Sequence, residues 1–321
     1  MSDFDAPAAQ GSGWFGTETN SGALALIEVP FDATSSHHRC ARYGPQAMRT
    51  ASHQVELTLV DGRCPARQGI VAQQLSIEQF NTEATLAMER LRQGDLDAAR
   101  LVDDAYARVE HMLGTALTEH WAQKRNVVVV GGDHSISYGA LRLALETCPD
   151  LGILHLDAHA DLRSAYEGVT CSHASIMNRI KALKPDVPLT QVGLRDLGAQ
   201  EKQRIQSDPS ILAFFDEALA QQQFLGMPWA EQAQAIIQTL PSEVWLSFDI
   251  DALDPSLCPN TGTPVPGGLS YYQAIDLIDR IHASGRSLIG ADLTEVAGDP
   301  YDALIGARLV YRILAGFSEK K

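Results

Sequence analysis

Residues 151–161 read LGILHLDAHAD, and the fold and the chemistry of the chain are organised around this stretch. The apolar run up to Leu156 is typical of a buried strand. Asp157, His159 and Asp161 then recur at every second position, so an extended chain would place all three side chains on one face. Three residues of metal-ligating type at the end of a strand favour a metal site over a solvated acidic loop with one incidental histidine.

A second stretch repeats this arrangement. Residues 243–255 read EVWLSFDIDALDP, in which an apolar strand is followed by Asp249 and, two residues on, Asp251. Several carboxylates that converge without a cation would repel one another, and most of them would have to be protonated. A bound metal removes this conflict, so the second stretch strengthens the prediction of a metal site.

A third strand ends in a glycine pair. Residues 127–135 read VVVVGGDHS, with His134 at the start of a predicted helix. Gly131 and Gly132 alone are compatible with a phosphate loop, but neither a G-x-G-x-x-G pattern nor a G-K-[ST] pattern accompanies them. We therefore interpret the pair as a tight turn that presents His134.

Composition excludes several classes of function. The chain has 321 residues, of which 25 are basic and 40 acidic, for a formal charge of −15. This balance argues against nucleic acid or an anionic membrane as partner and is compatible with a cationic substrate. We expect no signal peptide, no membrane-spanning helix and, with five scattered cysteines and no CxxC pair, a reduced cytoplasmic protein.

Strands and helices alternate along the chain, which predicts an α/β fold with three layers: a parallel, about eight-stranded sheet flanked by helices. The predicted strands are 23–29, 55–60, 127–131, 151–156, 189–194, 211–215, 243–249 and 287–292. The predicted helices are 44–49, 136–147, 172–183, 198–206, 229–239, 268–284 and 302–316, with a helical region over 75–122. We expect a disordered tail over residues 1–20 and a single catalytic domain over 21–317.

The three candidate groups all follow predicted strands, and ligands of a parallel sheet bind beyond the carboxyl ends of its strands. One shared site is therefore expected. Its metal ligands would be His134, Asp157, His159, Asp161, Asp249 and Asp251.

Two imidazoles and four carboxylates suit Mn²⁺ better than a thiolate-preferring metal, and they are more than one ion needs. Two ions ~3.5–4 Å apart lower the pKa of a shared water, so the predicted reaction class is metal-assisted hydrolysis. His155 is interpreted as a buried supporting histidine and Cys171 as inert. His37 and His38 are expected at the rim of the site.

The three motifs together resemble the ureohydrolase family, which includes arginases and agmatinases, and the resemblance extends from about residue 27 to residue 317. It implies an arginase-like fold, two Mn²⁺ per chain, a homo-oligomer (trimer or hexamer) and hydrolysis of a guanidino compound to urea and an amine. It also implies that His134 and Asp161 hold one ion, that His159 and Asp251 hold the other, and that Asp157 and Asp249 bridge them.

The same resemblance points to His173 as a proton shuttle and to Glu295 as the residue that binds the guanidinium. Both roles make chemical sense. The amine leaves only when it is protonated, which calls for a histidine, and a carboxylate pairs with a planar cation through two hydrogen bonds. The alternatives are that His173 merely follows the helix cap Ser172 and that Glu295 is a loop carboxylate.

The substrate is predicted from positions at which the sequence differs from the arginase pattern. Arg163 and Gly198 stand where arginases carry polar groups that bind the amino-acid head, and the loop 31–43 also departs from the family pattern. We therefore predict hydrolysis of agmatine to putrescine and urea. Guanidinobutyrate or another guanidino acid, received by Arg163 or Arg39, is the alternative, followed by arginine and formiminoglutamate. A deacetylase-like amidohydrolase with one zinc ion belongs to a different class, which the six-residue ligand set disfavours.

Overall fold

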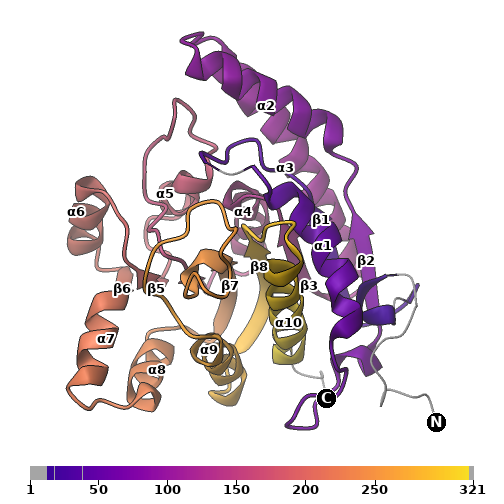
Figure 1. Cartoon of the computed structure of the whole chain (residues 1–321), viewed down its shortest axis with the longest axis vertical. Coiled ribbons are helices and arrows are strands. Elements are labelled where there is room, and N and C mark those ends of the chain that lie inside the picture. Colours follow the sequence, from indigo (N-terminus) through magenta and orange to yellow (C-terminus); the bar gives the residue numbers. More distant parts are fainter. Residues whose placement is uncertain (1–12, 18, 38, 318–321) are drawn as a thin grey trace.

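A computed structural model describes residues 13–17, 19–37 and 39–317, and it is built around one parallel sheet of eight strands (Figure 1). The strand order is β2-β1-β3-β8-β7-β4-β5-β6. The strands are β1 (Leu24–Val29), β2 (Ile70–Gln74), β3 (Asn126–Gly131), β4 (Leu151–Leu156), β5 (Leu189–Leu194), β6 (Ile211–Phe215), β7 (Glu243–Asp249) and β8 (Ser287–Thr294). Every pairing is parallel, which confirms the predicted fold class.

Helices cover both faces of the sheet. Successive residues of a strand point to opposite faces, and in the central strands both sets are apolar, so each face forms its own core. Leu24 and Leu26 belong to one core and Ala25 and Ile27 to the other. On the first face pack α1 (Gly44–Ala51), α7 (Asp216–Phe224), α8 (Trp229–Gln238), α9 (Tyr271–Ala283) and α10 (Pro300–Gly316). On the second pack α2 (Glu78–Arg92), α3 (Ala98–Ala122), α4 (Ser137–Thr147), α5 (Ile176–Leu183) and α6 (Ala199–Ser207).

One predicted strand is wrong. Residues 55–60 form no strand. They bury Val55 and Leu57 while leaving Val60 fully exposed, so the alternation reflects one-sided burial of an irregular segment. The eighth strand is instead β2, at the edge of the sheet, where the sequence IVAQQ has only three apolar residues before two glutamines and only Ile70 is buried. Edge strands are exposed on more sides than central ones, which explains the weak pattern.

Smaller differences concern helices and the N-terminal region. The helical region predicted over 75–122 is two helices, α2 and α3, which project together at the top of Figure 1, and α7 was not predicted. Order begins earlier than residue 20, because Trp14 and Phe15 are fully buried and the Trp14 indole donates a hydrogen bond to Glu28. Residues 1–12 of the predicted tail lie outside the described residues. In the described part of the chain, no helix is long and apolar enough to span a bilayer.

Candidate metal centre and its cavity

The predicted site residues follow four strands that are neighbours in the sheet, β3, β8, β7 and β4. His134 comes after β3, Glu295 directly follows β8, Asp249 ends β7 and Asp157 directly follows β4. Parallel strands end at the same edge, so the topology alone brings together residues that are far apart in the sequence. The prediction of one shared site at this edge is consistent with this arrangement.

The spacing of two within the motifs comes from turns rather than from the pleat of a strand. The Asp133 carboxylate accepts a hydrogen bond from the Ser135 N–H at 3.1 Å, and Asp249 accepts one from the Asp251 N–H at 2.8 Å. Asp157 accepts one from the His159 N–H in the same way. An aspartate that binds the backbone N–H two residues on ends a strand in a tight turn. The extended geometry expected for residues 157–161 is therefore wrong.

The turn sends His159 and Asp161 to different partners. His134 Nδ1 lies 3.1 Å from Asp157 Oδ2, 3.2 Å from Asp161 Oδ2 and 3.3 Å from Asp249 Oδ2. His159 Nδ1 lies instead 3.1 Å from Asp251 Oδ2 and 3.4 Å from Asp157 Oδ1. Two groups of metal-type ligands result, and Asp157 belongs to both. This sharing fits a pair of ions that have the Asp157 carboxylate in common.

Asp161 reaches its place through an unusual backbone. Its φ is 52°, in the left-handed region that few residues other than glycine adopt, and Glu295 has a φ of 59°. Such conformations cost on the order of 1–3 kcal/mol each and persist where the surroundings impose them. Both residues are almost fully buried at the site. The backbone at Asp161 and Glu295 is therefore locally unfavourable, and the surrounding structure holds it in the conformation that directs these two carboxylates into the site.

Electrostatic strain in the cluster favours a cation. Burial, followed by the charges of Asp251 and Asp157, holds the pKa of Asp249 well above its usual range. Burial and the charge of Asp157 raise the pKa of Asp161 to about 6. A divalent cation among these carboxylates would stabilise their charged forms and remove the repulsion.

The donor atoms fit such an ion. His134 Nδ1, Asp157 Oδ2 and Asp161 Oδ2 are buried, and in the described part of the chain none has an aligned hydrogen-bond partner despite their short separations. Buried polar atoms are normally satisfied, so three that converge without partners mark a place for a ligand. Imidazole nitrogen with carboxylate oxygen suits Mn²⁺ or a similar divalent metal, and no thiol takes part.

A buried hydrogen-bond chain fixes the tautomer of His134. Asp292 is fully buried and accepts the Ser247 hydroxyl at 2.9 Å, and the Ser247 Oγ lies 3.0 Å from His134 Nε2. The Ser247 hydrogen is donated to Asp292, so Ser247 Oγ accepts from His134 Nε2–H. Nδ1 is therefore the nitrogen that is left to offer a lone pair to a metal among the carboxylates. Ser137 and Trp245 also donate to Asp292 and hold it in place.

Replacement of Ser247 by alanine should therefore weaken metal binding. The His134 Nε2–H would lose its acceptor in a buried site, and partners of this kind are typically worth about 10–100-fold in metal affinity. Isothermal titration of the metal-stripped variant with Mn²⁺ measures the effect. Ser256→Ala is a control for the same substitution, because the exposed Ser256 lies in the segment after β7 and its N–H donates to Asp254 rather than to a candidate ligand. An unchanged affinity in Ser247→Ala would contradict this role.

His155 supports the cluster and is not a ligand. The Gln191 side-chain nitrogen donates to the Ala160 carbonyl at 2.8 Å and lies 2.9 Å from His155 Nδ1. Because that nitrogen is the donor, His155 Nδ1 accepts and its proton resides on Nε2. Nε2 lies 2.9 Å from Asp157 Oδ2, although without hydrogen-bond alignment. An N–H cannot bind a metal, so the interpretation as a supporting histidine fits this geometry better than membership of the ligand set.

Glu295 and His173 lie at the same site. One Glu295 oxygen accepts the His134 N–H at 2.9 Å, while burial and the charges of Asp249 and Asp133 hold the pKa of Glu295 well above its usual range. His173 opens a turn of 3₁₀ helix after Ser172, which caps it through the Ala174 N–H. The alternative that His173 follows a cap is thus true of its backbone, but its side chain also lines the cavity.

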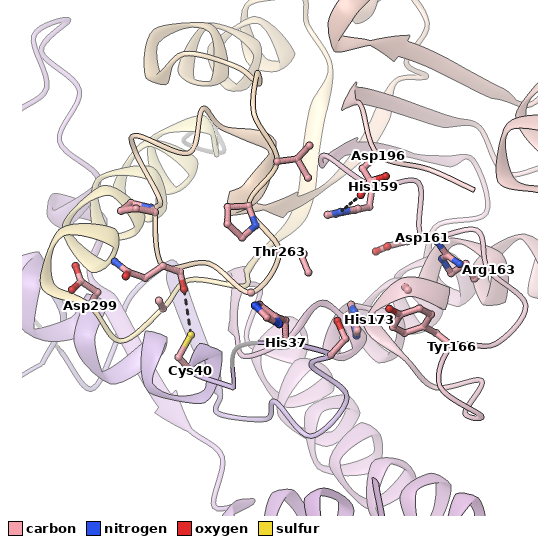
Figure 2. A pocket seen from close by; sticks show the side chains of 18 of the residues that line it. His37, Cys40, His159, Asp161, Arg163, Tyr166, His173, Asp196, Thr263 and Asp299 are labelled. Carbon is pink, nitrogen blue, oxygen red and sulfur yellow. Dashed lines mark hydrogen bonds and ion pairs between the residues drawn. The ribbon is translucent and has the colours of Figure 1, made fainter. Parts of the chain in front are cut away.

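A cavity of about 820 Å³ opens over the cluster, a size typical of small-molecule sites. Figure 2 shows His159, Asp161, Arg163, Tyr166 and Asp196 on one side of it and Cys40 and Asp299 on the other, with His37 and His173 between. His37 thus stands on the cavity wall, as expected for a rim residue, whereas His38 lies outside the described residues. The buried Cys171 donates to Asp103, and burial raises the pKa of its thiol, which favours the inert interpretation.

Arg163 forms part of the cavity wall, and the nearby Glu201 partly neutralises its charge. Its Nε lies 3.6 Å from Glu201 Oε2, and its guanidinium stacks over the Tyr166 ring at 5.2 Å. Glu201 in turn accepts the N–H groups of Leu162 and Gly198, which joins the loops after β4 and β5. The Arg163 side chain remains 45% exposed and reaches the cavity.

Known proteins resemble this chain over most of its length. Residues 23–316 match a family model described as the arginase family. N(1)-aminopropylagmatine ureohydrolase of Thermus thermophilus is 32% identical over 294 residues, which cover 91% of this chain and 89% of that protein. Guanidinobutyrase of Pseudomonas aeruginosa is 30% identical over 309 residues, covering 90% and 85%. The solved structure of proclavaminate amidino hydrolase from Streptomyces clavuligerus matches the fold with a TM-score of 0.73 at 21% identity, covering 97% and 98%.

Proposed function

The chain belongs to the arginase family, and from this premise we propose that it uses two Mn²⁺ ions to hydrolyse agmatine to putrescine and urea. The observation that carries the proposal is the pair of ligand groups that share Asp157 beside the cavity. In the proposed assignment His134 and Asp161 would hold one ion, His159 and Asp251 would hold the other, and Asp157 and Asp249 would contribute to both. When bound, two such ions lower the pKa of a water and polarise the carbon that it attacks.

Glu295 is proposed to orient the guanidinium. One of its oxygens accepts the His134 backbone N–H, so the other remains to accept an N–H of the planar cation. A guanidinium beside Glu295 would also stabilise the charged carboxylate, whose pKa burial raises. This pairing would place the guanidinium carbon next to the two ligand groups.

His173 is proposed to deliver a proton to the leaving amine nitrogen. Burial and the neighbouring His159 lower the pKa of His173 to about 4, so its imidazole is neutral at pH 7. A neutral ring can accept a proton on Nε2 and then release it, which is the requirement for a shuttle. The amine departs as the neutral molecule once its nitrogen has taken this proton.

The charges around the cavity support a cationic tail. Beyond the proposed metal ligands, the described residues of the wall include the acidic Asp196, Glu201 and Asp299 and the cationic Arg163, which Glu201 partly neutralises. A primary ammonium group is stabilised in such surroundings, and the carboxylate of guanidinobutyrate is stabilised less. Asp299 lies at the far end of the cavity, where its carboxylate could pair with the ammonium group of a longer amine, such as the substrate named for the Thermus thermophilus relative.

Guanidinobutyrate is the second candidate, because Arg163 reaches the cavity and a guanidinobutyrase is among the relatives. A substrate panel separates the cases. We expect kcat/KM to be highest for agmatine or its aminopropyl derivative and lowest for arginine, whose zwitterionic head would leave polar groups unpaired at a cost of ~1–3 kcal/mol.

Two variants sharpen this comparison of urea release. Arg163→Ala should leave agmatine turnover within a few-fold, whereas a selective loss of guanidinobutyrate turnover would promote the second candidate. Asp299→Asn keeps the side-chain oxygen that caps α10 and removes its charge, so it should raise KM for the aminopropyl derivative more than for agmatine. Arginine as the best substrate would overturn the assignment.

A further inference from the structure

The loop after β1 has a buried hydroxyl at its centre, that of Thr34, which connects two parts of the site. Both the backbone N–H and the hydroxyl of Thr34 donate to Asp133 Oδ2, each at 2.9 Å. The Thr34 oxygen in turn accepts the backbone N–H of His173 at 3.1 Å. Three segments that are distant in the sequence thus meet at one oxygen atom.

Asp133 is a rigid anchor for this oxygen. It is fully buried, and its other oxygen accepts the backbone N–H of Ser135 at 3.1 Å and also the Ser135 hydroxyl. Four hydrogen bonds therefore fix the carboxylate, and its backbone position beside His134 ties it to the ligand cluster. A group that is hydrogen-bonded to Asp133, such as the Thr34 hydroxyl, therefore has a fixed position relative to the ligand cluster.

The His173 ring lies against the same oxygen. Its Nδ1 is 3.5 Å from Thr34 Oγ1 and 3.3 Å from the hydroxyl of Ser172. Because the Thr34 hydrogen is donated to Asp133, Thr34 offers His173 only lone pairs, so it can accept from the ring and from the backbone. Ser172 precedes His173 in the chain and moves with it. Among these two hydroxyls only Thr34 links His173 to a different element of the site.

We propose that Thr34, anchored by Asp133, is a positioning residue that holds His173 over the cavity. The inference rests on the proton-shuttle role proposed above for His173. It also gives a role to a residue of the loop after β1. Thr34 touches neither a metal ligand nor the substrate in this assignment, and its effect on turnover passes through His173.

Replacement of Thr34 by valine keeps the shape and removes the hydroxyl. We expect kcat to fall by about 3- to 10-fold, the equivalent of one net hydrogen bond, with KM and bound Mn²⁺ unchanged. Thr34→Ser restores the hydroxyl and should recover most of the loss. Thr85→Val is a matched control, because the Thr85 hydroxyl in α2 has no hydrogen-bond partner in the described part of the chain.

A double-mutant cycle tests whether Thr34 acts through His173. In a His173→Asn background, Thr34→Val should add less than about 2-fold, since residues that act as a unit are not additive. Full additivity would overturn the inference, as would wild-type kcat in Thr34→Val or a loss of bound metal in that variant.

A spectroscopic arm separates this inference from the proposed function. If the wild-type protein released urea from no guanidino compound, the proposed function would fail, but the position of His173 could still be observed. The ¹⁵N signals of the His173 ring, assigned by their disappearance in His173→Asn, should shift in Thr34→Val and remain in place in Thr34→Ser. Identical His173 signals in the wild type and Thr34→Val would overturn the inference on its own.

Discussion

Replacement of Asp251 by alanine is expected to halve the metal content, from about two ions per chain to about one, and to lower urea release by at least ~10²-fold. Asp251 and His159 are assigned to one ion alone, whereas Asp157 and Asp249 are proposed to be shared by both ions, so the loss of Asp251 removes one site. His134, Asp161 and Asp249 stay together in the other. Metal analysis after reconstitution with Mn²⁺ and dialysis gives the stoichiometry.

Asp196→Ala is the matched control for this experiment. Asp196 also lies beside His159, at 4.0 Å from its Nε2, but its side chain is 70% exposed and it belongs to neither ligand group. Its removal should leave two ions per chain. The binuclear proposal would be contradicted if the wild-type protein were fully active with one bound ion per chain and Asp251→Ala changed neither the metal content nor the activity.

His173→Asn should lower kcat by about 10²–10⁴-fold, the usual contribution of a positioned proton donor, while bound metal stays constant. The pH dependence gives a second readout. Because the pKa of His173 is lowered to about 4, the neutral ring is already dominant at pH 6, and its own titration should cause no loss of wild-type turnover as the pH rises through 6.5. Stopped assays of urea from pH 6 to 10 measure both effects.

His37→Asn provides the comparison, since His37 lines the same cavity without a proposed role in catalysis. Its kcat should stay within a few-fold of wild type. If His173→Asn instead kept wild-type turnover across the whole pH range, His173 would be only the first residue of its turn, and the shuttle role would be withdrawn.

Local patterns were sufficient to predict much of the fold and to propose a set of candidate ligands. Central strands such as β4 and β7 are buried on both faces, so their apolar runs stand out in the sequence. Each is followed at once by its aspartates, and a backbone turn that needs an aspartate also produces the spacing of two. The edge strand β2 lacks such a signal because its exposed positions permit polar residues. Residues 55–60 were mistaken for a strand because apolar and polar residues also alternate in an irregular segment that is buried on one side.

The sequence by itself determined the class of fold, the six candidate ligands and the family, because each of these depends on residues close together in the chain. The family resemblance already implied a division of the ligands between two ions, and the tertiary structure adds which of their atoms converge and that Asp157 is common to both groups. Thr34 meets Asp133 across 99 residues and His173 across 139, and Ser247 meets His134 across 113. Contacts over such separations leave no periodicity in the sequence, since they depend on the order of strands in the sheet, which brings the ends of β1, β3 and β7 to one edge.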